Sequence, residues 1–275
     1  MQKKIEMEFR TIVDINAPGF RIEPCEEMLF VGSCFADNIG ARFKEEKFRA
    51  TVNPFGVMYN PASILHTVER LAQSEPSKLG SSRTAFFTLG TNHIYRLKET
   101  GEIVDNCQKR PQSLFTEEEL TVDECANYLQ KAIDILRAAN PDIHVVLTVS
   151  PIRYRKYGYH GSQLSKATLL LATRQVAGAS YFPAYEIVND ELRDYRFYAE
   201  DMLHPSSQAV EYIWQRLSEV YLSDAAKQFI KEWQPLKAAL NHKPFNPESQ
   251  EYRIFMDKTM LKIAELQKKY PNFAL

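Results

Sequence analysis

The sequence lacks the features that mark several large classes of protein. Its 275 residues include only 4 cysteines (Cys25, Cys34, Cys107 and Cys125), and no C-x-x-C pair indicates a zinc site or disulfide framework, so we expect reduced thiols. The 34 basic and 35 acidic side chains nearly cancel and form no long basic run, so we expect no nucleic-acid partner. Long apolar runs are missing, and the charged start lacks the apolar segment of a signal peptide. We therefore expect a cytoplasmic protein without a membrane partner.

What the sequence does contain is an alternation of strand and helix patterns. The apolar run 28–32 predicts a buried strand, and the four-residue spacing of Phe35, Ile39 and Phe43 predicts a helix after it. Further strands are predicted at 48–52, 84–89, 143–149 and near 180–182, and further helices from Pro61, from Thr116 with Glu119 as its capping partner, and over 165–176 and 209–220. This order predicts an α/β fold with a doubly wound, mostly parallel sheet of about five strands.

The last part of the chain has a different pattern. Residues 223–275 show no strand signal but two segments with helical spacing of apolar residues, one including Trp233 and the other including Ile263. We expect an α/β domain over residues 1–222, with residues 223–275 as a helical pair packed on it.

Ser33 is the first candidate for chemistry. It follows the strand 28–32 directly and opens the next helix, so it should lie at the carboxyl edge of the sheet, where doubly wound proteins place their active sites. The backbone N–H groups of a helix N-terminus can stabilise a developing oxyanion there. The alternative is that Ser33 only caps the helix, which serine often does.

Asp201 and His204 form the second candidate. They stand three residues apart on a predicted turn, and Pro205 keeps His204 out of helical geometry. An aspartate so placed can accept the imidazole Nδ1–H and leave Nε2 free to take the proton of a serine. The alternative is a surface turn with an incidental histidine. Together with Ser33, the pair predicts a Ser–His–Asp site whose Ser33 Oγ and His204 Nε2 lie within about 3.5 Å or share one water.

Several segments resemble the GSCFA family, whose name is spelled by residues 32–36. The chain is also similar to that family at 53–56 with 59–61, at 147–151 and at 193–205, over roughly residues 10–260. The resemblance implies membership of the SGNH, or GDSL-like, hydrolases, with a flavodoxin-like sheet. It places Ser33 in the serine block and Asp201 and His204 in the late Asp-x-x-His block.

The resemblance also implies two donors for an oxyanion hole, a glycine N–H and an asparagine side chain. Gly56 is the candidate for the first, and a plain Asn-Pro-Phe-Gly turn is its alternative. Asn92, in a partial match to the Gly-x-Asn-Asp block, is the candidate for the second, with Asn53 and Asn60 as substitutes and a plain turn as the alternative.

Other reactive residues have weaker patterns. Cys34 could act as a thiolate nucleophile at the helix N-terminus, although a small buried side chain is the commoner role. The remaining histidines have no neighbours at metal-ligand spacing, so we expect neither metal nor cofactor. The cluster 153–157, with two arginines, a lysine and two tyrosines, follows the strand 143–149 and should overhang the active-site edge, as a substrate contact or as a solvated loop.

These patterns predict a serine hydrolase that cleaves carboxylic esters, with a small-molecule or glycan acyl ester as partner and an acetyl group as one option for the acyl part. An O-acyltransferase would use the same site. A non-catalytic glycan-binding or scaffold protein with a degenerate site is the alternative from another class. The sequence indicates neither the substrate nor the oligomeric state.

Overall fold

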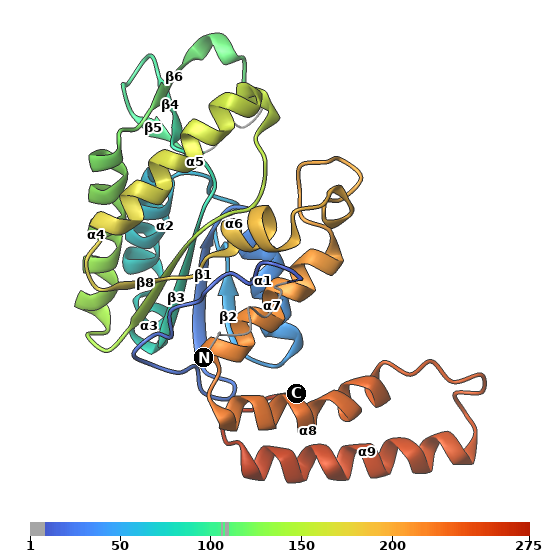
Figure 1. The fold of residues 1–275 in the computed structure, drawn as a ribbon. Coiled ribbons are helices and arrows are strands. Elements are labelled where there is room, and N and C mark those ends of the chain that lie inside the picture. The colour runs from blue at the N-terminus through green and yellow to red at the C-terminus, as the bar shows by residue number, and fades with distance from the viewer. Residues whose placement is uncertain (1–8, 106, 108–109) are drawn as a thin grey trace, which may run out of the picture.

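A five-stranded parallel sheet forms the centre of the fold in the computed structural model, which describes residues 9–105, 107 and 110–275 (Figure 1). Its strands are β1 (Glu27–Gly32), β2 (Arg49–Val52), β3 (Thr84–Leu89), β7 (His144–Val149) and β8 (Ala179–Tyr181). They lie in the order β2-β1-β3-β7-β8, and each neighbouring pair is parallel. The predicted doubly wound sheet is confirmed. The strand β1 is an inner strand, and β3 occupies the middle.

Helices cover both faces of this sheet (Figure 1). One face packs against α2 (Pro61–Ser74), α4 (Val122–Ala139) and α5 (Gly158–Gln175), and α3 (Pro76–Ser81) follows α2. The other packs against α1 (Cys34–Glu45), α6 (Ala184–Glu186), the π-helical η3 (Ile187–Leu192) and α7 (Ser207–Tyr221). Short 3-10 turns are η1 (Gln112–Leu114), η2 (Arg155–Tyr157) and η4 (Tyr195–Phe197).

The apolar run in β1 follows from this double cover. Leu29 and Val31 belong to the core on one face, whereas Met28 and Phe30 belong to the core on the other. Successive side chains of a strand point to opposite faces, so a strand covered on both sides is apolar throughout. This pattern places the end of β1, and with it Ser33, inside the sheet rather than at its margin.

A small antiparallel sheet corrects one sequence prediction. The strands β4 (His93–Leu97), β5 (Ile103–Val104) and β6 (Phe115–Glu119) pair in the order β5-β4-β6. The predicted helix start at Thr116 is therefore wrong, because Thr116 pairs with Arg96 in this sheet. The capping box that opens α4 lies five residues later, where Thr121 and Glu124 bond each other's backbone N–H groups. The pairs Thr116/Glu119 and Thr121/Glu124 both have the spacing of a capping box. The first pair lies in β6, which is bonded to β4, so only the second can open a helix.

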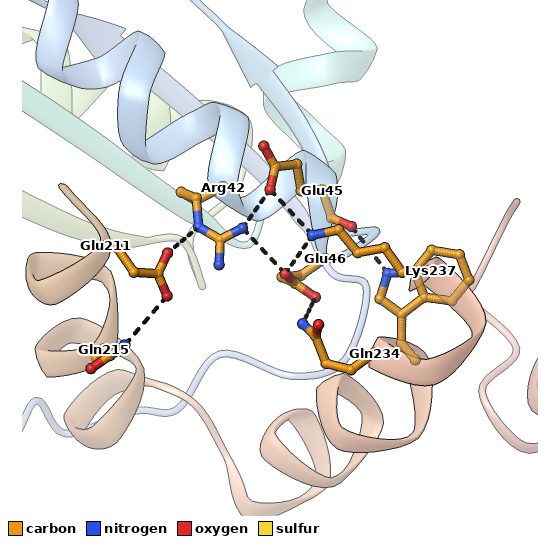
Figure 2. A network of polar contacts seen from close by, with 8 residues as sticks. Arg42, Glu45, Glu46, Glu211, Gln215, Gln234 and Lys237 are labelled. Carbon is orange, nitrogen blue, oxygen red and sulfur yellow. Dashed lines mark hydrogen bonds and ion pairs between the residues drawn. The ribbon is translucent and has the colours of Figure 1, made fainter. Parts of the chain in front are cut away.

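The C-terminal helices α8 (Asp224–Leu240) and α9 (Gln250–Lys269) form the expected helical pair, which extends beyond the sheet domain (Figure 1). Figure 2 shows how α8 is attached to the end of α1. The buried carboxylate of Glu46 accepts bonds from Lys237 Nζ at 2.9 Å and Gln234 Nε2 at 3.0 Å, while Arg42 approaches it from α1 at 3.3 Å. Arg42 also contacts Glu211 of α7 at 3.0 Å. The network thus ties α1, α7 and α8 together, whereas the predicted domain boundary at 222/223 stays a prediction.

Candidate active site

Ser33 lies at the carboxyl end of β1, where the strand passes into α1. The approach to β3 is very close at this point, since a Cβ on Gly32 would lie 2.2 Å from the Thr88 carbonyl oxygen. Gly32 also has a φ of +145°, which disfavours any other residue. The close approach and the positive φ explain why the residue before Ser33 is glycine. They also fix the position of the Ser33 backbone, from which its side chain extends.

The hydroxyl of Ser33 is held by its neighbours. Its Oγ lies 3.1 Å from Thr88 Oγ1 and accepts a bond from the Phe35 N–H at 3.3 Å, so Ser33 does cap α1. The Ser33 N–H donates to the Thr88 carbonyl at 3.0 Å. The residue is 0% exposed. In this conformation the candidate nucleophile is at the expected edge of the sheet but closed to solvent.

Asp201 and His204 form a hydrogen-bonded pair. Asp201 Oδ2 lies 2.6 Å from His204 Nδ1, and Asp201 Oδ1 accepts the N–H groups of Leu203 at 2.9 Å and His204 at 3.0 Å. These two backbone bonds, with the imidazole, lower the pKa of Asp201 to about 2. The carboxylate therefore stays ionised wherever an imidazole titrates. Within the described residues, His204 Nε2 has no hydrogen-bond partner, so the ring can accept a proton from a reactant.

The loop that carries this pair is attached to the segment after β7. The Arg153 N–H donates to the Leu203 carbonyl at 3.0 Å, and its guanidinium donates to the Met202 carbonyl, also at 3.0 Å. Because β7 and β1 are parallel strands of one sheet, their carboxyl ends lie at the same edge. No hydrogen bond joins the described Ser33 and His204 side chains directly, and their catalytic pairing stays a prediction.

The two predicted oxyanion donors make bonds within the protein. The Gly56 N–H donates to the Asn53 carbonyl at 2.9 Å, which is the turn described as its alternative. The Asn92 amide Nδ2 donates to the Leu120 carbonyl at 2.8 Å and is buried at the start of the small sheet. The Gly56 N–H and one N–H of the Asn92 amide are thus engaged in this conformation, and both oxyanion roles remain predictions.

Of the two substitutes, Asn60 has the freer amide. Asn53 accepts the Gly32 N–H at 2.9 Å and donates to Asp37 at 2.7 Å, so it braces the start of α1. Asn60 uses its oxygen to cap α2 through the Ser63 N–H at 2.9 Å. Its Nδ2 has no partner in the part of the chain that the structure describes, and Asn60 lines a pocket. The cap fixes the side chain and leaves a donor available.

Cys34 points to a tyrosine. Its Sγ lies 3.8 Å from the Tyr59 hydroxyl, and the side chain is only partly buried. All four cysteines are free, and burial raises the pKa of the Cys25 and Cys125 thiols to about 12. Those two are structural side chains, whereas the role of Cys34 as an alternative nucleophile stays a hypothesis.

Lys166 is a feature that the sequence patterns missed. It lies on α5, is buried, and donates from Nζ to the carbonyls of Gly90 and Ser150, each at 2.7 Å. These carbonyls directly follow β3 and β7, so one amine joins the two strand ends next to the candidate site. Burial lowers the pKa of Lys166 to about 7. Its only sequence signal is a lysine on the apolar face that includes Leu169.

Because of the buried Lys166, the stability of the folded protein should depend on pH. Its pKa in the folded state, about 7, lies below the ordinary value of 10.5, so above pH 7 the unfolded chain binds more protons than the folded one. The free energy of unfolding should then rise by roughly 1.5 kcal/mol between pH 7 and pH 8.5, because burying the charged amine is costly only while it is protonated. Urea unfolding at both pH values measures this rise.

The matched variants are Lys166→Met and, as control, Lys131→Met on the exposed face of α4. The first should flatten the rise between pH 7 and pH 8.5, and the second should keep it. An unchanged rise in Lys166→Met would show that other groups cause the pH dependence.

The described residues contain no group of three or more histidine, cysteine, aspartate or glutamate side chains that could hold a metal ion. Nor does any helix in the described ranges have the length and apolar character needed to span a membrane. The absence of a cofactor and the cytoplasmic location remain predictions.

Comparison with known proteins gives two family matches. The model of the GSCFA family matches residues 27–81 and 76–217, and that of the GSCFA domain protein, C-terminal domain, matches residues 233–275. The first match contains Ser33, Asp201 and His204, and the second covers the C-terminal part of α8 and all of α9. No curated protein matches the chain.

Solved structures give distant likenesses. A carbohydrate esterase family 3 from Talaromyces cellulolyticus is 12% identical, with a TM-score of 0.41 over 75% of this chain and 99% of that one. A GDSL-like lipase from Bacteroides thetaiotaomicron is 13% identical, with a TM-score of 0.43 over 74% of this chain and 87% of that one. The lipase Lip_vut3 from a goat rumen metagenome is 9% identical, with a TM-score of 0.42 over 73% and 99%. The fold of this chain is therefore assigned from its own strand order, and not from these similarities.

Proposed function

This chain belongs to the GSCFA family, and we propose that it is a serine hydrolase that cleaves carboxylic esters. The observation that carries the proposal is the Asp201–His204 pair, whose 2.6 Å contact orients an imidazole with no Nε2 partner among the described residues. Ser33 supplies the nucleophile at the same edge of the sheet, at the N-terminus of a helix. An oriented base and a hydroxyl beside backbone donors are the parts that acyl transfer needs.

The proposed reaction has two halves. Ser33 Oγ attacks the carbonyl carbon of the ester while His204 Nε2 takes the hydroxyl proton, and the same proton passes to the departing alcohol. The acyl-serine then reacts with water, whose proton goes to His204 and back to Ser33 as the carboxylic acid leaves. An alcohol in place of water would transfer the acyl group instead. Asp201 stays ionised throughout and stabilises the imidazolium.

The reaction requires Ser33 to become accessible. The segment Met58–Tyr59 crosses the ends of β1 and β3, because the Met58 N–H donates to Gly32 at 2.8 Å and the Tyr59 carbonyl accepts from Gly90 and Thr91 at 2.9 and 2.8 Å. These are single backbone bonds, each of modest net free energy. Displacement of this segment would let substrate reach Ser33 and let the Oγ turn from Thr88 towards His204.

A non-catalytic binding protein is the second candidate. The burial of Ser33 and the occupied donors of Gly56 and Asn92 are what favour it, because a degenerate site has no need of an accessible nucleophile. A protein of this kind would keep a ligand pocket and lack turnover.

A fluorophosphonate probe separates the two candidates. The probe phosphonylates an activated serine, so digestion and mass spectrometry should find its mass on the peptide that contains Ser33. Ser33→Ala should lose the label and Cys34→Ser should keep it. The hydrolase proposal fails if Ser33 stays unlabelled at millimolar probe while the protein is folded.

Paired substitutions test the amide donor. If Asn60 donates to the oxyanion, Asn60→Ala should lower kcat by about 10²-fold, the usual effect of losing one such donor. Asn92→Ala should lower kcat by a similar factor if the sequence prediction is right. Thermal unfolding is needed beside the kinetics, since each asparagine also makes a structural bond. A normal kcat in both variants would leave the oxyanion to backbone donors.

A further inference from the structure

We propose that the pocket beside Ser33 binds an uncharged pyranose ring, so that the substrate is an acyl ester of a sugar or glycan. This inference rests on the proposed function and specifies its alcohol part. The pocket has a volume of about 390 Å³, within the range of about 300–1,000 Å³ usual for small-molecule sites. Six of the side chains that line it carry the argument: Tyr59, Asn60, His93, Tyr95, Tyr154 and Tyr157.

The pocket begins next to the candidate nucleophile. Tyr59, which lines it, has its hydroxyl 3.8 Å from Cys34 Sγ, the residue after Ser33. Tyr154 packs edge-on against Tyr59 with ring centroids 6.1 Å apart. Thr91, two residues beyond the end of β3, also belongs to the lining. A ring held here would place an attached ester group towards the end of β1.

Aromatic rings form much of the wall. His93 and Tyr157 are stacked, with ring centroids 3.6 Å apart and an interplanar angle of 4°. Tyr95 and Tyr157 are each only partly buried. Lys156 Nζ lies over both rings, 4.6 Å from the Tyr95 centroid and 5.4 Å from the Tyr157 centroid, so a ligand would contact the parts of these rings that stay exposed. The face of an aromatic ring is electronegative and attracts the positive edges of C–H groups, which a pyranose presents on its flat side. Rings of this kind with a few polar groups suit a sugar better than an alkyl chain.

Polar atoms without partners lie among these rings. Asn60 Nδ2 is a free donor, and the buried His93 Nδ1 and Tyr154 hydroxyl have no hydrogen-bond partner among the described residues. Burial lowers the pKa of His93, so its ring is neutral near pH 7 and can both donate and accept. Buried polar atoms normally have a partner, and small shifts would let sugar hydroxyls supply it.

The charges of the described residues around the pocket favour an uncharged ligand. No lysine or arginine is among the described residues that line it. Asp105, which does line it, is paired with His66 at 2.8 Å, and the nearby Lys156 is paired with Glu117 at 2.9 Å. Among the described residues, a phosphate or carboxylate would meet the carboxylate of Asp105 and no unpaired lysine or arginine of the lining, which disfavours binding. An uncharged polyol has no such penalty.

Two esters of one acid test the proposal. Acetate release from methyl 6-O-acetyl-β-D-glucopyranoside should exceed that from ethyl acetate by at least tenfold in kcat/KM, because only the sugar ester fills the pocket. Tyr157→Ala should reduce this ratio at least tenfold, mainly through KM, and Tyr157→Phe should largely restore it. Tyr252→Ala on α9, outside the pocket, should leave the ratio unchanged. An equal loss for both esters in Tyr157→Ala would overturn the inference.

Binding without turnover separates failure of the pocket from failure of the hydrolase proposal. Saturation-transfer NMR with the methyl β-glycosides of glucose, xylose and N-acetylglucosamine should show contact with wild-type protein and with Ser33→Ala, and loss of contact in Tyr157→Ala. If the glycosides contact the protein but no ester is cleaved, the proposal of a sugar-binding pocket is supported and the proposal of a hydrolase is rejected. If ethyl acetate is cleaved but none of the three glycosides contacts the protein, the sugar-binding pocket is rejected and the hydrolase proposal stands.

Discussion

Ser33→Ala and His204→Ala should each lower kcat for 4-nitrophenyl acetate by about 10⁴- to 10⁶-fold. The first removes the atom that forms the acyl bond, and the second removes the base that takes its proton, so either loss disables the same step. The double variant should be no slower than the slower single variant, because residues that act as a unit are not additive. Release of 4-nitrophenolate measures all three rates.

Two further variants make this result specific. Asp201→Asn should cost a similar factor or less, since it keeps the shape but loses the charge that supports the imidazolium. Cys34→Ser should stay near the wild-type rate, because it removes only the neighbouring thiol. If Cys34→Ser abolishes turnover and Ser33→Ala does not, Cys34 is the nucleophile. If all four variants retain activity, the reaction occurs elsewhere on the protein.

Trp233→Ala should lower the free energy of unfolding by about 3–5 kcal/mol, the range for removing a buried tryptophan side chain. Trp233 is 2% exposed and packs against Phe273 with ring centroids 5.4 Å apart. Its Nε1 donates to the Glu45 carbonyl at 3.0 Å, next to the polar network of Figure 2. It therefore joins the core of the C-terminal pair to the end of α1.

Urea unfolding followed by circular dichroism measures this loss, and limited proteolysis shows where it occurs. Cleavage between α8 and α9 should become faster in Trp233→Ala if the C-terminal pair detaches. Phe245→Ala is the matched control, because Phe245 is fully exposed and surface substitutions usually change stability by less than about 0.5 kcal/mol. A loss below about 1 kcal/mol in Trp233→Ala would mean that this contact contributes little to the attachment.

The Asp201–His204 pair illustrates what a sequence can predict. The two residues are three apart on one turn, so their contact depends only on local backbone geometry, and Pro205 limits that geometry. The helix caps at Ser33 and Asn60 were predictable for the same reason. The contact between Ser33 and His204 is different, because these residues lie far apart in the chain and their separation depends on how several loops pack.

The five strands of the main sheet could be predicted from apolar periodicity, because periodicity records which faces of a strand or helix are buried. Contacts between segments distant in the chain set the features that periodicity does not record. Pairing with β4 made Phe115–Glu119 a strand although Thr116 and Glu119 fit a capping box. The burial of Lys166 and the pocket of tyrosines also required the fold, since burial is set by residues distant in the chain. For the same reason, the backbone bonds of the Met58–Tyr59 segment to the ends of β1 and β3 could be seen only once these strands lay side by side.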